Sequence, residues 1–361
     1  MIIYFIVTND LCYDQRMIRI CTSLANAGYT IKLTGRKLKN SLPLINQPFQ
    51  QKRLRCLFTK GKLFYAEYNI RVLFYLLFKK MDCICSIDLD TILPCYFISK
   101  LKNIPRVYDA HELFCEMKEI VSRPNIYRAW KKIEKYTVPK FLNGYTVSKP
   151  IADEFNKMYK VSYEVIKNIP LKKDIQIPEK KEKYIVYQGA VNEGRSFETI
   201  IPAFKFVNAQ LIICGDGNFM QKAKQLAAEY DLNEKIIFKG YLLPKELQNY
   251  TIEAWIGINL VDDKGLNNYY SLANRFFDYM HAGLPQLCVD FPAYREINEE
   301  FEFAVLMCDL SPENIARQIN ILLEDEDLYR RLQRNCMSSR KVFNWQNEEV
   351  KLIHFYKKLF G

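Results

Sequence analysis

The sequence predicts an α/β protein made of two doubly wound domains. Its 361 residues are more than a single hydrophobic core usually organises. In both halves, short apolar runs alternate with stretches whose apolar residues recur at helical spacing, which is typical of parallel strands joined by right-handed crossovers. Between the halves, residues 168–184 carry two prolines and no apolar periodicity, as expected of an exposed linker.

The first domain is expected to span residues 1–170. It begins with an apolar run at residues 2–7 that predicts a strand. Between Asp14 and Ala27, apolar residues return at spacings of four and three, which places them on one face of a helix, and Gly28 follows where a C-terminal cap is expected. Further strands are expected at residues 30–33, 83–87, 106–108, 144–147 and 163–166.

The second domain, residues 171–344, shows the clearer alternation. Its predicted strands, about six in number, are residues 184–187, 211–214, 236–238, 255–260, 286–289 and 303–307. Residues between them have helical spacing, for example 219–230 and 312–324. Two such domains joined by a linker would leave a cleft at the carboxyl ends of both sheets, where open α/β folds bind ligands.

The composition excludes several classes of protein. With 49% apolar and 26% charged residues, the chain is neither disordered nor of low complexity. Eleven cysteines without paired spacing indicate reduced side chains in a cytoplasmic protein. The first residues lack a basic n-region and a small-residue cleavage site, so we expect no signal peptide. The longest apolar run, Val72–Phe78, is far shorter than the roughly 20 residues of a membrane-spanning helix.

The sequence offers few candidate ligands for a metal ion. It contains three histidines, which argues against a site built from several imidazoles. Asp88 and Asp90 form a D-x-D pair of the kind that can bind metal, but we interpret them as part of a solvated loop at the end of a strand. We therefore expect no bound metal ion.

Two junctions between a strand and a helix carry glycines. In the first, the segment 215–217 (Gly-Asp-Gly) follows a buried strand, and its glycines would let a phosphate approach the free amides of a helix start. Met220 occupies the third glycine position of the dinucleotide-binding pattern, so a simple tight turn explains this segment equally well.

The second junction places Arg195 between Gly194 and a predicted helix. A cation at the start of a helix opposes the usual preference for acidic residues in the first turn. An anion between the arginine and the helix amides would resolve this conflict. We therefore predict a phosphate contact by Arg195, with a solvated surface arginine as the alternative.

Two further segments concentrate polar side chains. Asn274, Asp278 and His281 lie four and three residues apart on one predicted helix and share a face, which is either the wall of a cleft or an ordinary surface. His111 and Glu112 follow a predicted strand at its carboxyl end, which is a favoured ligand position in open α/β sheets. The alternative is that His111 caps the following helix.

In this order, the segments resemble the retaining glycosyltransferases of family 4, or glycosyltransferase group 1, over essentially the whole chain. The resemblance rests on the D-x-R helix opening at Asp14 and Arg16, and on DLDTILP, VYDAHELF, TVSKPIADEF, the GDG turn and NRFFDYMHAGLP. It implies the GT-B fold, in which two Rossmann-like domains face a central cleft. The first domain would bind the acceptor and the second the nucleotide sugar, and residues 345–361 would form a C-terminal helix that crosses back to the first domain.

The resemblance also implies roles for individual residues. Arg195 would contact the donor diphosphate, Asp278 the ribose hydroxyls and His111 the transferred sugar, and these three would be the catalytic residues. The nucleotide pocket would be lined by Gly189, Arg195, Gly215, Asp216, Tyr241, Leu242, Asn274 and Asp278. On the acceptor side, the resemblance places Asp14, Arg16 and Glu112.

The implied reaction moves a sugar, with retention, from a nucleotide-diphosphate sugar to an acceptor hydroxyl in cell-surface glycan or glycolipid biosynthesis. The donor is a substrate, and neither a cofactor nor a metal is expected beside it. The sequence departs from the family pattern at Ala190, which replaces a basic residue, at Tyr270, which replaces the first glutamate of a Glu-x7-Glu pair, and at Asp278, which shortens the second. Two alternatives stay open: a GT-B-type sugar-nucleotide epimerase with Glu112 as acid or base, and a non-catalytic glycan-binding or partner subunit.

The charge of the chain points to an anionic partner. Fifty-two Lys and Arg against 41 Asp and Glu give a net charge of +11. Residues 32–80 contain twelve Lys and Arg and one acid, Glu67, interleaved with apolar and aromatic residues. In a family whose acceptors are often lipid-linked, this pattern indicates peripheral contact with anionic lipid at the inner face of the membrane, and a merely solvated basic face is the alternative. The sequence contains no recognised nucleic-acid-binding motif, so we expect no nucleic-acid partner.

Overall fold

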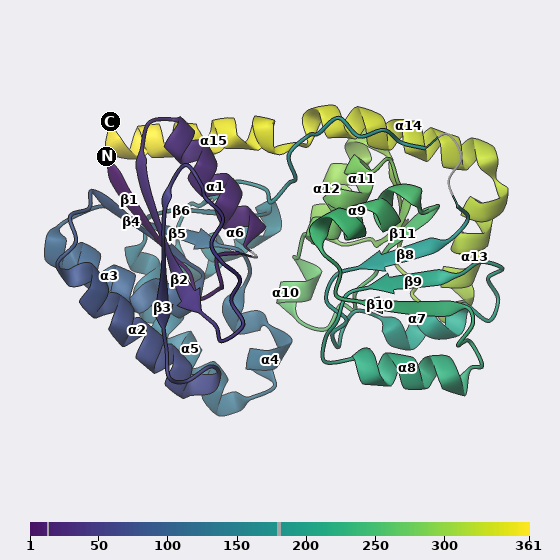
Figure 1. The fold of residues 1–361 in the computed structure, drawn as a ribbon, viewed down its shortest axis with the longest axis horizontal. Coiled ribbons are helices and arrows are strands. Elements are labelled where there is room, and N and C mark those ends of the chain that lie inside the picture. The colour runs from purple at the N-terminus through teal and green to yellow at the C-terminus, as the bar shows by residue number, and fades with distance from the viewer. Residues whose placement is uncertain (13, 179–181) are drawn as a thin grey trace. The chain divides into compact units, whose positions relative to one another are not determined.

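The computed structural model describes residues 1–12, 14–178 and 182–361, and these residues fold into two compact units (Figure 1). The first unit comprises Met1–Asn168, the short segment Gly265–Asn267 and the C-terminal Gln346–Gly361. The second comprises Ile169–Lys264 and Asn268–Trp345. The sequence placed the boundary two residues later, after residue 170. Within the predicted linker, residues 179–181 lie outside the described residues, and Ile169 belongs to the core of the second unit.

The first unit is built on a seven-stranded parallel sheet in the order β3-β2-β1-β4-β5-β6-β7. Its strands are β1 (Ile2–Ile6), β2 (Thr30–Lys37), β3 (Gln50–Arg55), β4 (Cys83–Ile87), β5 (Arg106–Ala110), β6 (Asn143–Thr146) and β7 (Glu164–Val165). Its helices are α1 (Gln15–Asn26), α2 (Gly61–Leu77), α3 (Ile92–Lys102), α4 (Lys118–Val121), α5 (Pro124–Thr137), α6 (Lys149–Tyr159) and α15 (Trp345–Phe360). The edge strand β3 was not predicted, because its residues, QQKRLR, are polar and lack an alternating apolar pattern.

Local sequence signals explain the start of the first unit. The Asp14 carboxylate accepts the backbone N–H of Met17 at 3.0 Å and so caps α1. The apolar stripe of α1 is buried against the sheet, as its spacing predicts. The strand order reverses between β1 and β4, which makes the carboxyl ends of these strands the switch point where open α/β sheets bind ligands.

The C-terminal helix α15 is part of the core of the first unit. Its Phe355 and Tyr356 rings contact Tyr145 of β6, with ring centroids 5.3 and 6.4 Å apart, and Tyr356 also contacts Phe5 of β1. Tyr356 is fully buried. Because α15 completes this core, the end of the chain stabilises the domain in which the chain begins.

The second unit is built on a six-stranded parallel sheet in the order β10-β9-β8-β11-β12-β13. Its strands are β8 (Ile185–Gln188), β9 (Leu211–Cys214), β10 (Ile236–Gly240), β11 (Ile256–Asn259), β12 (Gln286–Val289) and β13 (Ala304–Met307). The helices of the second half of the chain, up to α15, are α7 (Phe197–Ala203), α8 (Met220–Glu229), α9 (Pro244–Glu253), α10 (Leu266–Tyr269), α11 (Asn274–His281), α12 (Pro292–Phe301), α13 (Pro312–Glu324) and α14 (Glu326–Val342). The predicted fold class, two Rossmann-like parallel-sheet domains, is confirmed.

Both faces of the second sheet are covered by apolar side chains. A large cluster that includes Ile200, Ile213 and Ile319 lies on one face, and a smaller cluster that includes Val186 and Tyr279 lies on the other. Buried on both faces, these strands are nearly continuous apolar runs, which is why the sequence predicted them well. In the described part of the chain, no helix combines the length and the apolar character needed to cross a bilayer.

Candidate functional site

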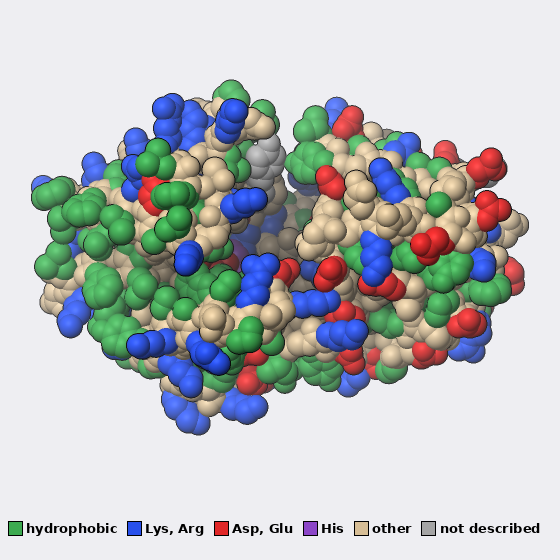
Figure 2. Space-filling model, turned by 90° about the horizontal axis from the view of Figure 1, so that it is seen from below, with side chains coloured by type: hydrophobic (Ala, Val, Ile, Leu, Met, Phe, Trp, Pro, Cys, Tyr) green, Lys and Arg blue, Asp and Glu red, His purple; other side chains and the backbone are tan. Residues whose placement is uncertain are grey.

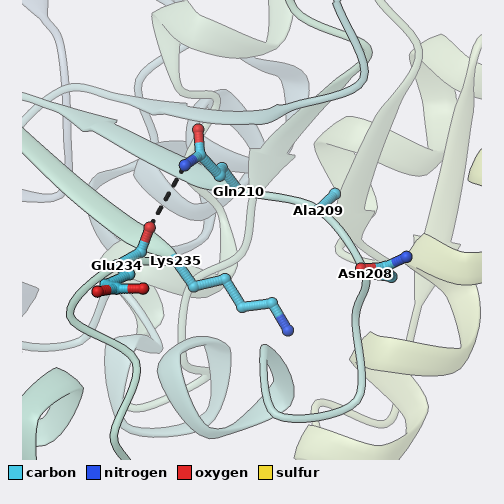
Figure 3. A pocket seen from close by; sticks show the side chains of 5 residues that line it. All are labelled: Asn208, Ala209, Gln210, Glu234 and Lys235. Atoms are coloured by element: carbon cyan, nitrogen blue, oxygen red, sulfur yellow. Dashed lines mark hydrogen bonds between the residues drawn. The ribbon is translucent and has the colours of Figure 1, made fainter.

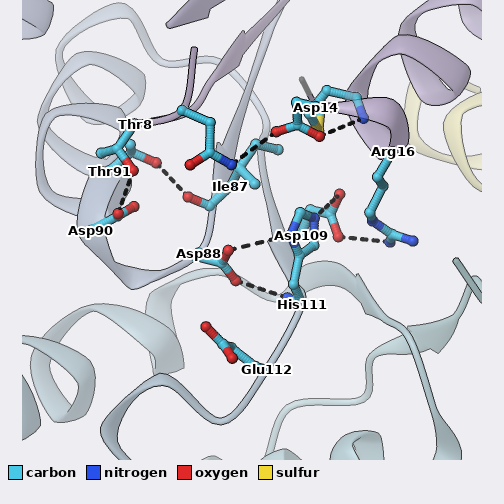
Figure 4. A network of polar contacts seen from close by, with 12 residues as sticks. Thr8, Asp14, Arg16, Ile87, Asp88, Asp90, Thr91, Asp109, His111 and Glu112 are labelled. Atoms are coloured by element: carbon cyan, nitrogen blue, oxygen red, sulfur yellow. Dashed lines mark hydrogen bonds and ion pairs between the residues drawn. The ribbon is translucent and has the colours of Figure 1, made fainter. Parts of the chain in front are cut away.

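The polar side chains of the first unit gather at the carboxyl ends of β4 and β5, next to β1 (Figure 4). Asp88 directly follows β4, Asp109 lies at the end of β5, and His111 and Glu112 follow β5. The register of the two parallel strands pairs Ile87 with Asp109. Residues that are about twenty positions apart in the sequence therefore meet at one edge of the sheet.

His111 is held between two carboxylates. Its backbone N–H donates to Asp88 Oδ1 at 2.9 Å, its ring Nδ1 lies 3.3 Å from Asp88 Oδ2, and its Nε2 lies 3.2 Å from Asp109 Oδ2. Burial alone would lower the pKa of His111, but the charges of Asp88 and Asp109 outweigh it and raise this pKa to about 9. The ring is therefore a partly exposed imidazolium at neutral pH, and it offers a fixed positive charge to a ligand.

Asp109 is in turn held by Arg16. The Arg16 guanidinium donates to Asp109 Oδ1 at 2.9 Å and to the Ile166 carbonyl at 3.2 Å, and both charged side chains are almost fully buried. Burial would raise the pKa of Asp109, but the charges of Arg16 and His111 lower it below its ordinary value. The four groups, Arg16, Asp109, His111 and Asp88, form a chain of alternating charge that fixes the imidazolium in place.

The loop after β4 is strained and buried, so our interpretation of Asp88 and Asp90 as a solvated loop is wrong. Asp88 has φ 54° and ψ 177°, a conformation that side-chain-bearing residues rarely adopt and that costs about 1–3 kcal/mol. Asp90 is 8% exposed and accepts a hydrogen bond from Thr8 Oγ1 at 2.6 Å. Burial raises the pKa of each carboxyl to about 6, although His111 opposes this for Asp88 and the Thr8 hydrogen bond opposes it for Asp90.

Glu112 is the acid–base candidate of this cluster. Burial and the neighbouring Asp88 carboxylate raise the pKa of Glu112 to about 7, so that it can both donate and accept a proton near neutral pH. Asn267, which belongs to the first unit, donates to Glu112 Oε2 at 3.2 Å and accepts the backbone N–H of Leu113 at 2.9 Å. Sequence reasoning missed Asn267 because it lies more than 150 positions away from these partners.

In the second unit, the glycine loops follow neighbouring strands. Gly189 follows β8, Gly215 follows β9 and Tyr241 follows β10, so all three lie at the carboxyl edge of the sheet. Gly189 and Gly215 have φ angles of 119° and 152°, and a Cβ on Gly215 would lie 1.8 Å from the Gly189 carbonyl oxygen. Close packing of the two loops therefore requires glycine at position 215.

Asp278 is positioned beside these loops by the end of β8. Gln188 Nε2 donates to Asp278 Oδ2 at 2.9 Å, and Thr251 Oγ1 donates to Gln188 Oε1 at 2.6 Å. Asp278 is half-buried on α11, and Asn274, the first residue of that helix, is exposed. Each carboxylate oxygen can accept more than one hydrogen bond.

A buried cation, Arg275, lies next to Gly189. Its Nε donates to Asn259 Oδ1 at 2.7 Å, and its Nη1 donates to the Tyr187 hydroxyl at 2.8 Å and to the Gln188 carbonyl at 3.1 Å. These partners are neutral, and among the described residues Nη2 has no hydrogen-bond partner. A Cβ on Gly189 would lie 3.2 Å from Nη1. A buried charge without an opposite charge is costly, so this arrangement suits a site that receives an anion.

Comparison with known proteins agrees with this architecture. Residues 168–337 match the family described as glycosyl transferases group 1. The matched residues lie in the second half of the chain and cover most of the second unit. The sequence resemblance is confirmed at this level, and membership of the narrower family 4 stays a prediction.

Several solved structures share the whole fold, at identities that establish the fold alone. Sucrose-phosphate synthase from Thermosynechococcus elongatus is 17% identical with a TM-score of 0.79, and the match covers 100% of this chain and 99% of that one. HepE from Anabaena in complex with UDP-glucose is 10% identical with a TM-score of 0.74, covering 99% and 100% of the two chains. A TarM variant from S. aureus in complex with fondaparinux, alpha-GlcNAc-glycerol and UDP is 11% identical with a TM-score of 0.74, covering 100% and 99%. None of the curated protein sequences gives a significant match.

At three of the expected residues, the structure differs from what the sequence suggested. Arg16 was expected on the acceptor side, and the structure buries its guanidinium against Asp109, so this side chain is not exposed to a ligand. Arg195 was expected at the start of a helix, but α7 begins at Phe197, with Ser196 as its N-cap residue. His281 was expected on the polar face of α11, but it is buried, its Nε2 lies 2.8 Å from the Phe343 carbonyl, and burial lowers its pKa to about 4.

The other expected residues are placed as follows. Asp14 caps α1 and also accepts a hydrogen bond from Asn9 Nδ2 at 3.1 Å. Asp216 and Tyr241 are exposed after β9 and β10, and Leu242 is half-buried and packs against the smaller apolar cluster. Arg275 was not predicted as a site residue, although it directly follows Asn274. The predicted polar stripe of Asn274, Asp278 and His281 lies on another face of α11.

The cavity in Figure 3 lies at the opposite edge of the second sheet. It has a volume of about 330 Å³ and is lined by Asn208, Ala209, Gln210, Glu234 and Lys235. Gln210 and Lys235 immediately precede β9 and β10, so this depression lies at their amino ends, away from the glycine loops. We assign it no part in the site. Among the described residues, no cluster of three or more His, Cys, Asp or Glu side chains has an arrangement suited to a metal ion.

Proposed function

We propose that this protein is a retaining glycosyltransferase that moves a sugar from a nucleotide-diphosphate sugar to a hydroxyl of a glycan or lipid-linked acceptor, in cell-surface glycan or glycolipid biosynthesis. The observation that carries the proposal is the buried Arg275 beneath the Gly189 loop, in a domain of the glycosyl transferases group 1 family. A diphosphate is the kind of anion that a fixed cation beside glycine amides would bind. HepE and TarM, which share the fold, have been solved with UDP-glucose and with UDP.

In this proposal, the second unit binds the donor. Asp278, which accepts a hydrogen bond from Gln188, also accepts hydrogen bonds from the ribose hydroxyls. Arg195 contacts the diphosphate. Arg275 supplies positive charge from beneath. The remaining lining residues are Gly189, Gly215, Asp216, Tyr241, Leu242 and Asn274, of which Gly189, Asp216, Tyr241 and Asn274 are exposed.

The chemistry follows from where charge develops. When the bond between the sugar C1 and the phosphate oxygen breaks, negative charge grows on the departing diphosphate, and fixed cations and amide dipoles lower the barrier. The acceptor oxygen forms its bond to C1 on the same face, and the leaving phosphate takes the acceptor proton. This route needs no separate base and no metal ion, so we expect full activity in the presence of a chelator.

In the first unit, His111 is the residue that contacts the transferred sugar. Its imidazolium is fixed by Asp88 and Asp109, so it can stabilise negative charge on sugar oxygens without rearrangement. We place Asp14 and Glu112 on the acceptor side. Arg16 is a positioning residue, because it reaches the site only through Asp109.

The proposal is tested first by the donor. A panel of nucleotide sugars is screened for thermal stabilisation, and the best one is then offered with candidate acceptors while NMR records the anomeric configuration of the product. We expect one donor to raise the melting temperature and the product to retain the configuration of the donor. An inverted product would contradict the mechanism, and no stabilisation by any saturating donor would favour a non-catalytic glycan-binding or partner subunit.

The role of Arg195 is tested by substitution. Arg195→Ala should reduce turnover by about two orders of magnitude or more, since it removes a cation from the developing charge. Arg317→Ala, which removes an exposed arginine on α13, is the matched control and should leave turnover unchanged. Equal rates of transfer in both variants would remove Arg195 from the mechanism.

A second candidate function rests on Glu112. A carboxyl with a pKa of about 7 in the site is what a GT-B-type sugar-nucleotide epimerase would need as an acid or base. An epimerase needs no acceptor, so incubation with a nucleotide sugar alone separates the two candidates. We expect the sugar to remain unchanged, and accumulation of its epimer would favour the second candidate.

We further propose that the enzyme works in the cytoplasm, at the inner face of a membrane when its acceptor is lipid-linked. The unpaired cysteine spacing and the basic segment 32–80 support this location.

A further inference from the structure

Helix α2 of the first unit is apolar on two opposite sides. One side, formed by Phe64, Tyr68, Val72 and Leu76, is buried against the sheet, and Tyr68 also donates a hydrogen bond to the Val7 carbonyl at 2.5 Å. The opposite side carries Leu63, Ile70, Phe74 and, directly after the helix, Phe78. These four side chains are 52%, 54%, 64% and 85% exposed. A surface helix ordinarily has polar residues on its outer side, so this exposed apolar stripe needs an explanation.

The exposed apolar surface extends beyond α2. Helix α3 packs against α2 and exposes Phe97 and Leu101, which are one turn apart, and the loop before α2 exposes Leu57 and Phe58. We call the surface formed by these eight side chains the α2–α3 face; its members are Leu57, Phe58, Leu63, Ile70, Phe74, Phe78, Phe97 and Leu101. Figure 2 shows apolar side chains interspersed with Lys and Arg over the first unit.

The charges along these helices are basic. Lys60, Lys62, Lys79, Lys80 and Lys100 are exposed at the ends of α2 and on α3. Glu67 is the only acid between residues 32 and 80, and its carboxylate is already engaged. It accepts the backbone N–H groups of Leu57 and Phe58 at 2.9 Å and pairs with Arg71 at 2.7 Å. The one acid of this segment therefore holds the Leu57–Phe58 loop in place.

We propose that the α2–α3 face docks on an anionic lipid bilayer, with its apolar side chains inserted between the lipids and its lysines at the headgroups. An interfacial helix has this combination of an apolar face and flanking lysines. Lysine stems can lie along the apolar region while their ammonium groups reach the lipid phosphates. A second copy of the chain fits less well, because pairing two such faces would bring two basic rims together. The proposal concerns a surface apart from the proposed donor site and does not depend on the transfer reaction.

The first test measures binding of the whole chain to vesicles. Co-sedimentation is compared between vesicles of phosphatidylcholine alone and vesicles that also contain phosphatidylglycerol, at low and high salt. Binding should require the anionic lipid and should weaken at high salt, with each lysine at the surface contributing about fivefold in affinity. Absence of binding to the anionic vesicles at low salt would overturn the proposal.

The second test separates insertion from simple charge attraction. A Phe74→Glu, Phe78→Glu double variant should bind anionic vesicles at least about tenfold more weakly, because two apolar anchors become like-charged with the lipid. Phe206→Glu is the matched control, since Phe206 is 59% exposed but lies in the second unit, and it should bind like the unaltered chain. If the double variant binds as well as the control, the apolar side chains do not insert.

A third measurement keeps the result independent of folding and of self-association. The fluorescence of the tryptophan introduced by Phe78→Trp should be quenched by lipids brominated along the acyl chain. The fluorescence of the tryptophan introduced by Phe206→Trp should not be quenched. Sedimentation analysis without vesicles should show the same mass for the double variant and the unaltered chain. If the double variant converts a dimer into a monomer and the Phe78→Trp signal is not quenched, a second copy occupies the face and the lipid proposal is wrong.

Discussion

The carboxyl edges of the two sheets differ in how their buried charges are compensated. In the first unit, Arg16, Asp109, His111 and Asp88 compensate one another, so the site is complete without a ligand. In the second unit, Arg275 has neutral partners and a nitrogen without one among the described residues. The first edge therefore holds a fixed imidazolium, and the uncompensated charge at the second edge is what led us to propose an anion there.

The largest expected effect comes from breaking the compensated network. Arg16→Met leaves Asp109 buried without its cation and should lower the free energy of unfolding of the first unit by about 3–5 kcal/mol. Arg71→Met, which breaks an exposed ion pair with Glu67, is the control and should cost less than about 1 kcal/mol. Urea unfolding of variants that retain only Trp130 reports on the first unit. Equal losses in the two variants would show that burial of the network does not matter.

The two units should respond to pH in opposite directions. The folded pKa of His111, about 9, lies above its ordinary value of 6.5, so its contribution is complete below pH 6.5 and is lost as the pH rises through 9. The raised pKa values of Asp88 and Glu112 act in the same direction, because protonation favours the folded state. His281, with a folded pKa of about 4, contributes fully above pH 6.5 and loses its contribution as the pH falls through 4. Where its contribution is complete, each histidine adds about 3 kcal/mol to the free energy of unfolding.

This prediction is checked by urea unfolding between pH 4 and 10. Variants that retain only Trp130 or only Trp255 report on the first and second units respectively. His111→Gln should flatten the alkaline loss in the first unit, and His281→Gln should flatten the acid loss in the second. If both units lose stability on the same side of neutrality, the contrast between the two histidines is wrong.

The smallest expected effect sharpens the comparison at the second edge. Arg275→Met should change the free energy of unfolding little, since removing a buried charge that lacks an opposite charge offsets the cost of leaving the Asn259 and Tyr187 oxygens without this donor. The same variant should weaken donor binding about tenfold to a hundredfold, as expected from losing a hydrogen bond to a charged group worth about 1.5–3 kcal/mol. Calorimetric titration with the preferred nucleotide sugar measures this, with Arg317→Met as control. Unfolding at low denaturant with unchanged donor affinity would make Arg275 a structural residue.

Much of the candidate site follows from position along the chain. The family resemblance grouped Gly189 and Gly215. Both come directly after apolar runs, and the carboxyl ends of parallel strands meet at one edge, so their positions along the chain are enough to bring them together. The same reasoning located His111 and Glu112. It failed for Asp88 and Asp90 because their burial depends on His111 and Thr8, which lie 23 and 82 positions away.

The sequence by itself determined the two parallel-sheet domains, because strands buried on both faces leave continuous apolar runs. It also determined the glycine turns and the surplus of positive charge. Only the tertiary structure decided which charges are compensated, since the Arg16–Asp109 pair joins residues 93 positions apart and the burial of Arg275 depends on Tyr187 and Asn259. It also decided which side of α2 is exposed. A helix that is apolar all round carries no periodic signal for its outer face, so that face is defined only when the sheet covers the other.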